Sequence, residues 1–355
     1  MNILMITRIV DRNHSHAGHT YRWVQEIGKQ LSPGRLRVLC LERGEVSGLP
    51  ENVSVQSLGK EEVRSRFLRF LSFPFAAWPL VRRADAVFCH QNPEYTIAVW
   101  PLAKLFRKRI VTWYVHGAVT WKTRAVARLA DVILTASLES FRVASPKVRV
   151  VGHGIDTDAF QPLPKRAPNQ HFQIVSVGRI SPTKDYETLI KAAAELKRAG
   201  HQTAVTIVGE PGLPEQVAYL ESLKVLTIRL GLDEVVRFVG PVPNRDVVAY
   251  FQQADLAVSL SGTGSLDKAV LEPMACGCPV ITSNAAFRGV LPDFLVVPGN
   301  DFRTLRAAIE RVMALRPAEC ETLGNQLREI VVKNHTLRGL AGKIISACGS
   351  NGSIS

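Results

Sequence analysis

The segment QIVSVGRISPTKDYETLIKAAAELKRAGHQTAVTIV, residues 173–208, decides which fold the sequence predicts. Residues 173–177 are an apolar run that predicts a strand, and residues 185–199 follow a helical pattern. Residues 203–208 then predict a second strand. A strand, a helix and another strand in this order are typical of a parallel α/β sheet.

The same alternation extends in both directions from this segment. In the first half we expect strands at residues 2–7, 36–41, 53–58, 86–89, 109–115, 132–136 and 148–151. In the second half we expect strands at 235–239, 256–260 and 280–282, and helices at 215–230, 246–253 and 267–276. The Pro-, Lys- and Asn-rich stretch 161–169 interrupts this pattern and is the best candidate for a linker. The fold class predicted is therefore α/β with two doubly wound, Rossmann-like domains, residues 1–163 and 164–334.

Length and composition are consistent with such a protein. The 355 residues suffice for two domains with separate cores, and 46% hydrophobic with 21% charged residues excludes wholesale disorder. Residues 1–10 are apolar but short, and no small-residue cleavage site follows, so we expect a first strand there and no signal peptide. The apolar stretch 70–80 contains two prolines and is too short to span a membrane, which needs about 20 residues.

Six cysteines are scattered along the chain without the spacing of a zinc site. Cys276 and Cys278 flank one glycine, and two interpretations are open: a redox or metal pair, or reduced thiols at a tight helix end. We favour the second, because a metal site needs further ligands nearby. Reduced thiols favour a cytoplasmic location.

The net charge of +13 is unevenly distributed. Residues 1–166 contain 25 Lys and Arg against 13 Asp and Glu, whereas residues 167–355 contain 19 against 18. Such an asymmetry indicates a polyanionic partner for the first half. An anionic membrane face and a nucleic acid are the two candidates.

Arg179 and Lys184 lie between the strand and the helix of the opening segment. Two cations beside a helix N-terminus, with Asp185 as its expected cap, suit a diphosphate. The alternative is a pair of solvated surface cations.

Glu272 lies in the segment Leu271–Pro279, within an otherwise apolar helix. A carboxylate on an apolar face is costly unless it meets donors, so this residue indicates either a ligand or a structural salt bridge. Pro273 follows it and should kink the helix.

Together, Gly178–Lys184 and Leu271–Pro279 resemble the nucleotide-sugar site of the family-4 retaining glycosyltransferases (glycosyl transferases group 1), which have the GT-B fold. This resemblance implies two Rossmann-like domains facing a central crevice, the first completed by a C-terminal helix within residues 335–355. It assigns Arg179 and Lys184 to the donor diphosphate and Glu272 to the ribose hydroxyls of the donor nucleotide. It implies no covalent nucleophile.

The stretch Thr263–Lys268 departs from the family pattern. Gly264 stands where the family carries a first glutamate, which contacts hydroxyls of the transferred sugar, and Asp267 stands in place of a glycine. We expect Gly264, Ser265, Leu266, Asp267 and Lys268 to bind the donor, with Ser265 capping the helix. Asp267 is then a candidate substitute for the missing glutamate, and Lys268 a candidate partner for an acidic group on the sugar.

In the first half, His116 follows a predicted strand where the family often has a histidine close to the reacting sugar, and we predict a catalytic role for it. Gly18 begins the first helix and is a candidate for backbone contact with the β-phosphate, although the usual double glycine is absent. The polar loop after another strand offers His90, Asn92 and Glu94 as candidate acceptor contacts.

Asp156-Thr157-Asp158 matches the short DxD pattern that holds a divalent metal in the other glycosyltransferase fold. Here the triplet lies in a segment that resembles the interdomain loop of the family. We therefore expect no metal and no bound cofactor, with the nucleoside-diphosphate sugar as a substrate.

Residues 60–83 interleave basic with apolar side chains: Arg64, Arg66, Arg69, Arg82 and Arg83 alternate with Phe67, Leu68, Phe70, Leu71, Phe73, Phe75, Trp78 and Leu80. Such a segment suits the surface of an anionic membrane. A core-packed helix with solvated arginines is the alternative.

The sequence thus predicts a retaining, metal-independent hexosyl- or related glycosyltransferase. Its acceptor is a hydroxyl, with lipid-linked sugars and cell-envelope polysaccharide precursors as the classes considered, and it acts in the cytoplasm or at the inner membrane face. The alternatives are a sugar-nucleotide-binding protein without transfer activity, because Gly264 replaces glutamate, a GT-B epimerase, and a nucleic-acid-binding protein. No nucleic-acid-binding motif accompanies the basic half, so we expect no nucleic acid partner.

Overall fold

The computed structural model describes residues 1–14, 17–164, 169–262 and 264–349. The chain divides into two compact units: the first is formed by Met1–Asp156 and Thr336–Ser355, and the second by Thr157–His335. The division thus falls between Asp156 and Thr157, ahead of the Pro-rich stretch that the sequence marks as a linker.

The first unit is built on a parallel sheet that has seven strands among the described residues. Its order is β3-β2-β1-β4-β5-β6-β7, with β1 (Ile3–Val10), β2 (Leu36–Arg43), β3 (Val53–Ser57), β4 (Ala86–His90), β5 (Arg109–Trp113), β6 (Val132–Thr135) and β7 (Val148–Val150). The central strands are buried on both faces, β4 and β6 along their whole length, and this explains their continuous apolar sequence.

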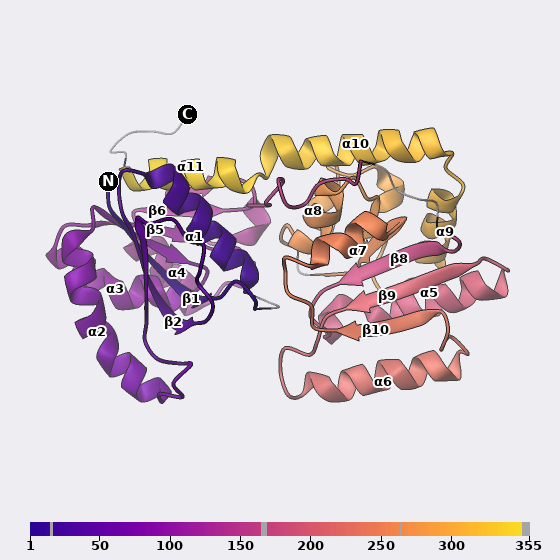
Figure 1. Ribbon diagram of the computed structural model, residues 1–355, viewed down its shortest axis with the longest axis horizontal. Helices are drawn as coiled ribbons and strands as arrows, with labels where there is room; N and C mark the ends of the chain where they lie inside the picture. The colour runs from indigo at the N-terminus through magenta and orange to yellow at the C-terminus, as the bar shows by residue number, and fades with distance from the viewer. Residues whose placement is uncertain (15–16, 165–168, 263, 350–355) are drawn as a thin grey trace. The chain divides into compact units, whose positions relative to one another are not determined.

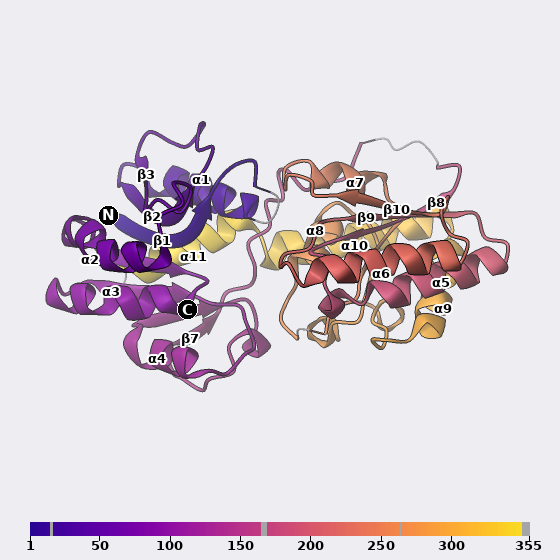
Figure 2. The ribbon, with the colours of Figure 1, turned by 90° about the horizontal axis from the view of Figure 1, so that it is seen from below.

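Helices cover both faces of this sheet (Figure 1). On one face lie α1 (Gly18–Leu31) and α11 (Leu337–Gly349); on the other lie α2 (Arg66–Arg83), α3 (Pro93–Leu105) and α4 (Trp121–Leu129). Val24, Ile27 and Leu31 of α1 are buried, as their helical spacing predicts. Helix α11 is the last of the described elements, yet it packs with α1, β4 and β5 (Figure 2).

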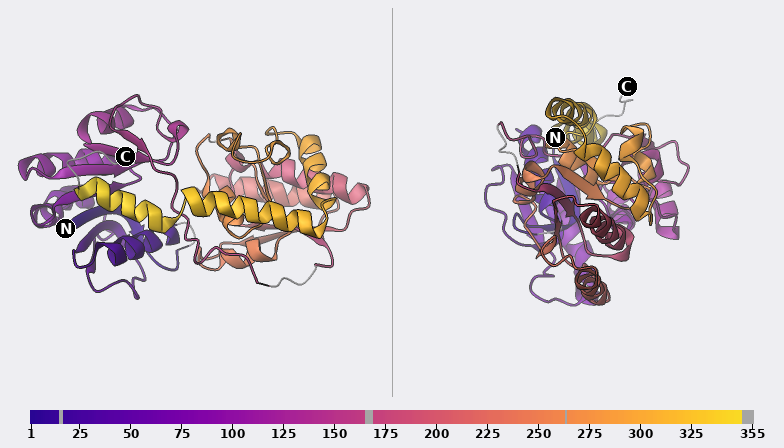
Figure 3. Two further views of the ribbon diagram at one scale, coloured as in Figure 1. Left: turned by 90° about the horizontal axis from the view of Figure 1, so that it is seen from above. Right: turned by 90° about the vertical axis from the view of Figure 1, so that its right-hand side faces the viewer.

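The second unit is built on a parallel sheet that has five strands in the described part of the unit, in the order β10-β9-β8-β11-β12. The strands are β8 (Phe172–Val177), β9 (Thr203–Val208), β10 (Val236–Gly240), β11 (Leu256–Ser259) and β12 (Val280–Thr282). One face is covered by α5 (Tyr186–Arg198), α6 (Gln216–Arg229) and α9 (Phe302–Met313), and the other by α7 (Val247–Gln253), α8 (Lys268–Ala275) and α10 (Pro317–Asn334). Figure 3 shows α10 running along the second unit and α11 along the first.

In each sheet the strand order reverses beside the first strand of the unit. The reversal lies between β1 and β4 in the first unit and between β8 and β11 in the second. Ligands of doubly wound sheets bind outside the carboxyl ends of the strands at this point. The loops that follow β8 and β11 are therefore the place to look for a ligand site in the second unit.

The division into units sharpens the charge asymmetry of the chain. The residues of the first unit include 25 Lys and Arg against 12 Asp and Glu, and those of the second include 19 against 19. The whole basic surplus of the protein therefore belongs to the first unit.

Candidate functional site

The loop that follows β8 begins at Gly178 and is fixed by the neighbouring strand. The Gly178 amide donates to the carbonyl of Val208 at 3.0 Å, and the Ile180 amide donates to the carbonyl of Glu210 at 2.9 Å. A short 3-10 helix, Pro182–Lys184, then leads into α5. Arg179 is exposed on this loop, so its guanidinium is accessible to a ligand.

Lys184 points to the loop after β11, where it forms an ion pair with Asp267. Lys184 Nζ lies 2.5 Å from Asp267 Oδ2, and the two side chains are 17% and 20% exposed. The carboxyl ends of β8 and β11 are adjacent, and this juxtaposition brings together two residues 83 positions apart in the sequence. The cation predicted to bind phosphate is thus held by a carboxylate.

Asp267 is also the N-cap of α8. Its Oδ1 accepts from the Ala269 amide at 3.1 Å. The expectation that Ser265 caps this helix is therefore wrong, because α8 begins two residues later than a Ser265 cap requires. The Ser265 carbonyl instead accepts from Asn284 Nδ2 at 2.6 Å. Asn284 is fully buried and fixes this loop, a function that no motif in the sequence indicates.

Glu272 is buried within α8, with only 8% of its surface exposed. Lys268 lies one helical turn earlier, on the same side of the helix. Burial lowers the pKa of Lys268 to about 8, against the opposing attraction of Glu272 and Asp267. Two carboxylates and a poorly solvated amine therefore gather at the N-terminal half of α8. The helix continues through Pro273 to Ala275.

Asp185 does not cap α5 in the expected way. It occupies the N-cap position in a left-handed conformation, with φ 46°, and makes no capping bond. Its carboxylate accepts from the Asn300 amide at 2.9 Å instead. The carboxylate therefore ties the loop to the start of α9 and leaves the N-terminus of α5 without this cap.

Gly264 has φ +69°, in the left-handed region that favours glycine. A glutamate in this backbone conformation would be strained, so the loop as observed suits glycine and lacks the carboxylate of the family pattern. Leu266 is buried beside this loop. The neighbouring Thr263, which the sequence places in the same stretch, lies outside the described residues.

In the first unit, Gly18 and His116 also follow strands of the sheet. The Gly18 amide donates to the carbonyl of His14 at 3.0 Å, so the backbone group expected to meet a phosphate is already engaged. His116 is exposed three residues beyond β5, and its ring lies against Tyr114 with centroids 5.7 Å apart. Its accessibility is compatible with the predicted role, which stays a prediction.

His90 lies in the core, contrary to its expected place on an acceptor surface. Its exposure is 1%, its Nδ1 is 2.9 Å from Thr7 Oγ1, and its ring centroid is 4.8 Å from that of Trp23. The reason is that β4 extends one residue further than the sequence indicates. His90 is therefore the buried end of a strand and has no access to an acceptor.

Asn92 and Glu94 do line a cavity, a groove of about 690 Å³ within the first unit. Asn92 Nδ2 donates to the Tyr95 hydroxyl at 3.0 Å, and Lys122 Nζ donates to Glu94 Oε1 at 2.6 Å. Burial of the Glu94 carboxyl tends to raise its pKa. The hydrogen bond and charge of Lys122, with the charge of Arg66, outweigh this effect and lower the pKa of Glu94. Both predicted acceptor residues are thus on an accessible surface.

Among the described residues, no group of three or more His, Cys, Asp or Glu side chains is arranged to hold a metal ion. Asp156 of the DxD triplet forms an ion pair with Arg22, with its Oδ2 3.0 Å from Arg22 Nη1. Cys276 and Cys278 are buried thiols outside any disulfide, and burial raises the pKa of Cys276. These observations favour reduced thiols at a helix end over a redox or metal pair.

Most of segment 60–83 forms a helix with a buried and an exposed apolar side, and contact with a membrane stays a prediction. Helix α2 buries Phe73, Ala77 and Val81 against the sheet but leaves other large apolar side chains exposed. These are Phe67, Leu68, Phe70, Leu71, Phe75 and Trp78. None of the helices described is both long and apolar enough to cross a bilayer.

Comparisons with known proteins agree with the geometry of the second unit. Residues 160–329 match the family model of glycosyl transferases group 1, so the second unit belongs to this family. Among curated relatives, a D-inositol 3-phosphate glycosyltransferase of Saccharomonospora viridis is 30% identical over 217 residues, which cover 56% of this chain and 49% of that protein. The putative colanic acid biosynthesis glycosyltransferase WcaL of Escherichia coli is 26% identical over 279 residues, 70% of this chain and 66% of that protein. The chain thus spans about half to two thirds of the length of these relatives.

Solved structures extend the likeness of the fold to the whole chain. Alr3699/HepE of Anabaena in complex with UDP superposes with a TM-score of 0.78 at 17% identity, covering 98% of this chain and 99% of that one. Sucrose-phosphate synthase of Thermosynechococcus elongatus gives a TM-score of 0.75 at 17% identity, covering 98% of each chain. At such identity the likeness concerns the fold, and the fold is that of the GT-B glycosyltransferases, as the sequence predicts.

Proposed function

We propose that the protein is a retaining glycosyltransferase that moves a sugar from a nucleoside-diphosphate sugar to an acceptor hydroxyl without a metal ion. One observation carries the proposal. At the switch point of the second sheet, Arg179, Lys184, Asp267 and Glu272 lie on the two adjacent strand-end segments that carry the family's motifs. This combination of cations and a buried carboxylate suits a diphosphate and a ribose.

In this mechanism the developing negative charge resides on the departing diphosphate. Arg179 and Lys184 stabilise that charge, and the amide groups at the N-terminus of α8 add to the positive potential. Lys184 must leave Asp267 to contact the phosphate. Asp267 is then released at the place where the transferred sugar should lie, and we assign to it the contact that the family's missing glutamate makes. His116 is proposed to lie beside the reacting sugar.

Glu272 accepts hydrogen bonds from the ribose hydroxyls in this proposal. A buried carboxylate needs such donors, and the vicinal hydroxyls of a ribose match its two oxygens. The structures of Alr3699/HepE contain UDP and, in another crystal, UDP-glucose, so a uridine diphosphate sugar is the first donor to test.

We assign acceptor binding to the basic first unit, where Asn92 and Glu94 line the groove. The name of the Escherichia coli relative refers to colanic acid biosynthesis, which supports a cell-envelope precursor or lipid-linked sugar as the acceptor class. The exposed aromatic side chains of α2, flanked by arginines, support peripheral attachment to an anionic membrane surface.

A thermal-shift screen of nucleoside-diphosphate sugars tests the donor half of the proposal. A ligand present at 100 times its dissociation constant adds about 2.7 kcal/mol to the free energy of unfolding. Stabilisation by none of the donors would refute the proposal. For a donor that binds, the anomeric configuration of the product and activity in the presence of EDTA test retention and metal independence.

One specific feature favours a second function, a sugar-nucleotide-binding protein without transfer activity. Gly264 replaces a glutamate and Asp267 is bound to Lys184, so the contact to the sugar is altered. This alternative predicts stabilisation by a nucleotide sugar with neither transfer nor hydrolysis of any donor. Transfer to any acceptor excludes it.

A further inference from the structure

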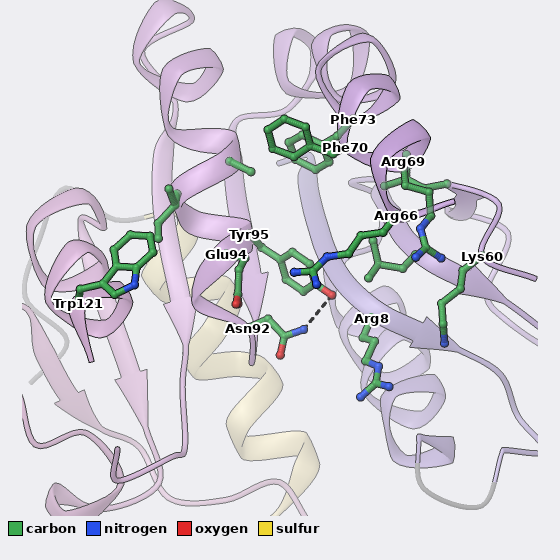
Figure 4. A pocket seen from close by; sticks show the side chains of 14 residues that line it. Arg8, Lys60, Arg66, Arg69, Phe70, Phe73, Asn92, Glu94, Tyr95 and Trp121 are labelled. Carbon is green, nitrogen blue, oxygen red and sulfur yellow. Dashed lines mark hydrogen bonds between the residues drawn. The ribbon is translucent and has the colours of Figure 1, made fainter. Parts of the chain in front are cut away.

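The groove of the first unit combines unpaired positive charge with an apolar wall. Its cationic lining residues are Arg8, Lys60, Arg66 and Arg69, and Phe70 and Phe73 are the aromatic residues of α2 that line it. Figure 4 shows cationic side chains reaching this space from β1, from the loop after β3 and from α2, with the aromatic rings of α2 beside them. All of these residues lie in one unit, so the groove is complete within it.

The position of Arg8 indicates that the groove binds a ligand. It is the one exposed residue of β1, a central strand whose other residues are buried. An arginine at the centre of a parallel sheet is costly unless its head reaches water or an anion. Here the side chain lines the groove, where it is accessible to solvent.

No carboxylate of the described residues forms a direct ion pair with an arginine of the groove, although the charge of Arg66 helps to lower the pKa of Glu94. Within the described parts of the chain, the guanidinium groups of Arg8, Arg66 and Arg69 form no ion pair and no hydrogen bond. Lys60 is paired with Glu42 at 2.5 Å, and the one carboxylate of the lining, Glu94, is paired with Lys122. Three guanidinium groups around one hollow suit the oxygens of a phosphate or diphosphate, which they bind by paired hydrogen bonds.

The other wall of the groove is a hydrocarbon surface. Leu41, Leu58, Phe73 and Ile97 line it, and Phe70 joins the groove to the exposed apolar face of α2. Phe70 is 72% exposed, and the other exposed aromatic side chains of α2 continue from it along the helix. An inorganic or sugar phosphate gains nothing from contact with an apolar surface, whereas a hydrocarbon chain attached to a phosphate is stabilised by burial against it.

We propose that this groove binds the phosphate or diphosphate of a long-chain lipid that carries the acceptor sugar, with α2 lying on the membrane that holds the lipid. The inference rests on the proposed glycosyl transfer for the role of the ligand, and on the groove alone for its chemistry. The phosphate lies among Arg8, Arg66 and Arg69, and the first part of the hydrocarbon chain lies against Phe70. Helix α2, with basic and aromatic side chains beside the opening of the groove, has the composition of helices that bind anionic bilayers.

Binding of a soluble probe, dodecyl phosphate below its micelle concentration, tests the chemistry. Inorganic phosphate and the uncharged detergent dodecyl maltoside are the comparison ligands, and calorimetry gives the three affinities. Each buried methylene raises affinity about fourfold, so dodecyl phosphate should bind more than about 100-fold more tightly than inorganic phosphate. Equal affinities for the two phosphates would overturn the assignment of a lipid.

Two variants locate the site, and a third serves as their control. Arg66→Gln with Arg69→Gln should weaken dodecyl phosphate binding about 10- to 100-fold and leave dodecyl maltoside unaffected. Ala98→Trp keeps the arginines but fills the groove, and should abolish the preference for dodecyl phosphate over inorganic phosphate. Arg82→Gln with Arg83→Gln removes the same charge from the same helix at residues that do not line the groove. A loss of binding in this control as large as in the first variant would contradict the proposal, because it would indicate general charge attraction.

The donor site gives an independent readout of the proposed function. If UDP-sugars stabilise the protein but dodecyl phosphate binds no better than inorganic phosphate, the lipid assignment is wrong and glycosyl transfer stands. If dodecyl phosphate binds in the groove but no nucleotide sugar stabilises the protein, the proposed function fails while the groove remains a lipid-phosphate site. Vesicles of phosphatidylcholine with and without phosphatidylglycerol then test the membrane surface, and binding should require the anionic lipid and fall with salt.

Discussion

Replacing Asp267 by asparagine separates the two tasks that the structure gives this residue. The carboxylate holds Lys184 at 2.5 Å and also caps α8 through the Ala269 amide. Asparagine is as good an N-cap as aspartate but has no charge. Asp267→Asn therefore keeps the helix start and removes the ion pair.

The size of the effect follows from the exposure of the pair. Exposed ion pairs contribute about 0.2–1 kcal/mol, and the low exposure of Lys184 and Asp267, 17% and 20%, places theirs at the upper end of this range. A nucleoside diphosphate that recruits Lys184 must break this pair and approach the carboxylate. Removing the carboxylate therefore saves about 1 kcal/mol, and affinity for UDP should rise about fivefold.

Titration calorimetry with UDP and with the donor sugar nucleotide measures the effect. Lys184→Met and the double variant complete a mutant cycle, in which the gain from Asp267→Asn should vanish once Lys184 is absent. If Asp267 also contacts the transferred sugar, UDP binding should improve while the rate of transfer falls. Unchanged or weaker UDP binding in Asp267→Asn, with an unchanged midpoint of thermal unfolding, would refute the idea that Lys184 exchanges the aspartate for a phosphate.

Three further outcomes are expected. Burial lowers the pKa of Lys268 to about 8, so the side chain loses its positive charge as pH rises through this value; affinity for the UDP anion should then fall, and Lys268→Gln should remove that dependence. The free energy of unfolding should rise with pH between about 8 and the ordinary lysine value of 10.5, because the unfolded chain holds the proton up to a higher pH than the folded chain does. A profile in Lys268→Gln that is as steep as in the natural protein would assign the titration to another group. Glu272→Ala should weaken UDP binding about 10- to 100-fold and abolish discrimination against 2′-deoxy-UDP, whereas retained discrimination would remove this carboxylate from the ribose. Gly209→Ala should destabilise the second unit by about 2 kcal/mol or more and weaken UDP binding, because a Cβ there would lie 1.9 Å from the carbonyl oxygen of Gly178; chemical denaturation checks this, and a stability loss below about 0.5 kcal/mol would contradict it.

Local sequence pattern was sufficient to predict the strands of both sheets, whereas helices α3, α4, α9 and α10 were not predicted. The predicted strands 203–208 and 280–282 have the bounds of β9 and β12, and helix α5 begins and ends within one residue of its expectation. Parallel strands buried on both faces have continuous apolar runs, and such runs can be read without knowing their partners. The doubly wound, two-domain architecture follows from their alternation with helices.

The cap of α8 and the end of β4 could be assigned only from the tertiary structure. Ser265 and Asp267 are both good N-cap residues, and only the observed start of α8 selects the second. His90 follows a predicted strand end in the sequence, yet one more residue of pairing places it in the core. Element boundaries depend on tertiary packing, so a polar residue at a boundary is easily assigned to the wrong side of it.

The sequence by itself determined the class of fold, the donor-site motifs around Arg179 and Glu272, and the basic character of the first half, because each depends on residues that are close in the chain. Only the tertiary structure decided which charges are paired. The Lys184–Asp267 pair joins residues 83 positions apart, and the groove joins Arg8 of β1 to Arg66 and Arg69 of α2. Electrostatic interaction depends on distance and burial, and both are set by how the strands are ordered in the sheet.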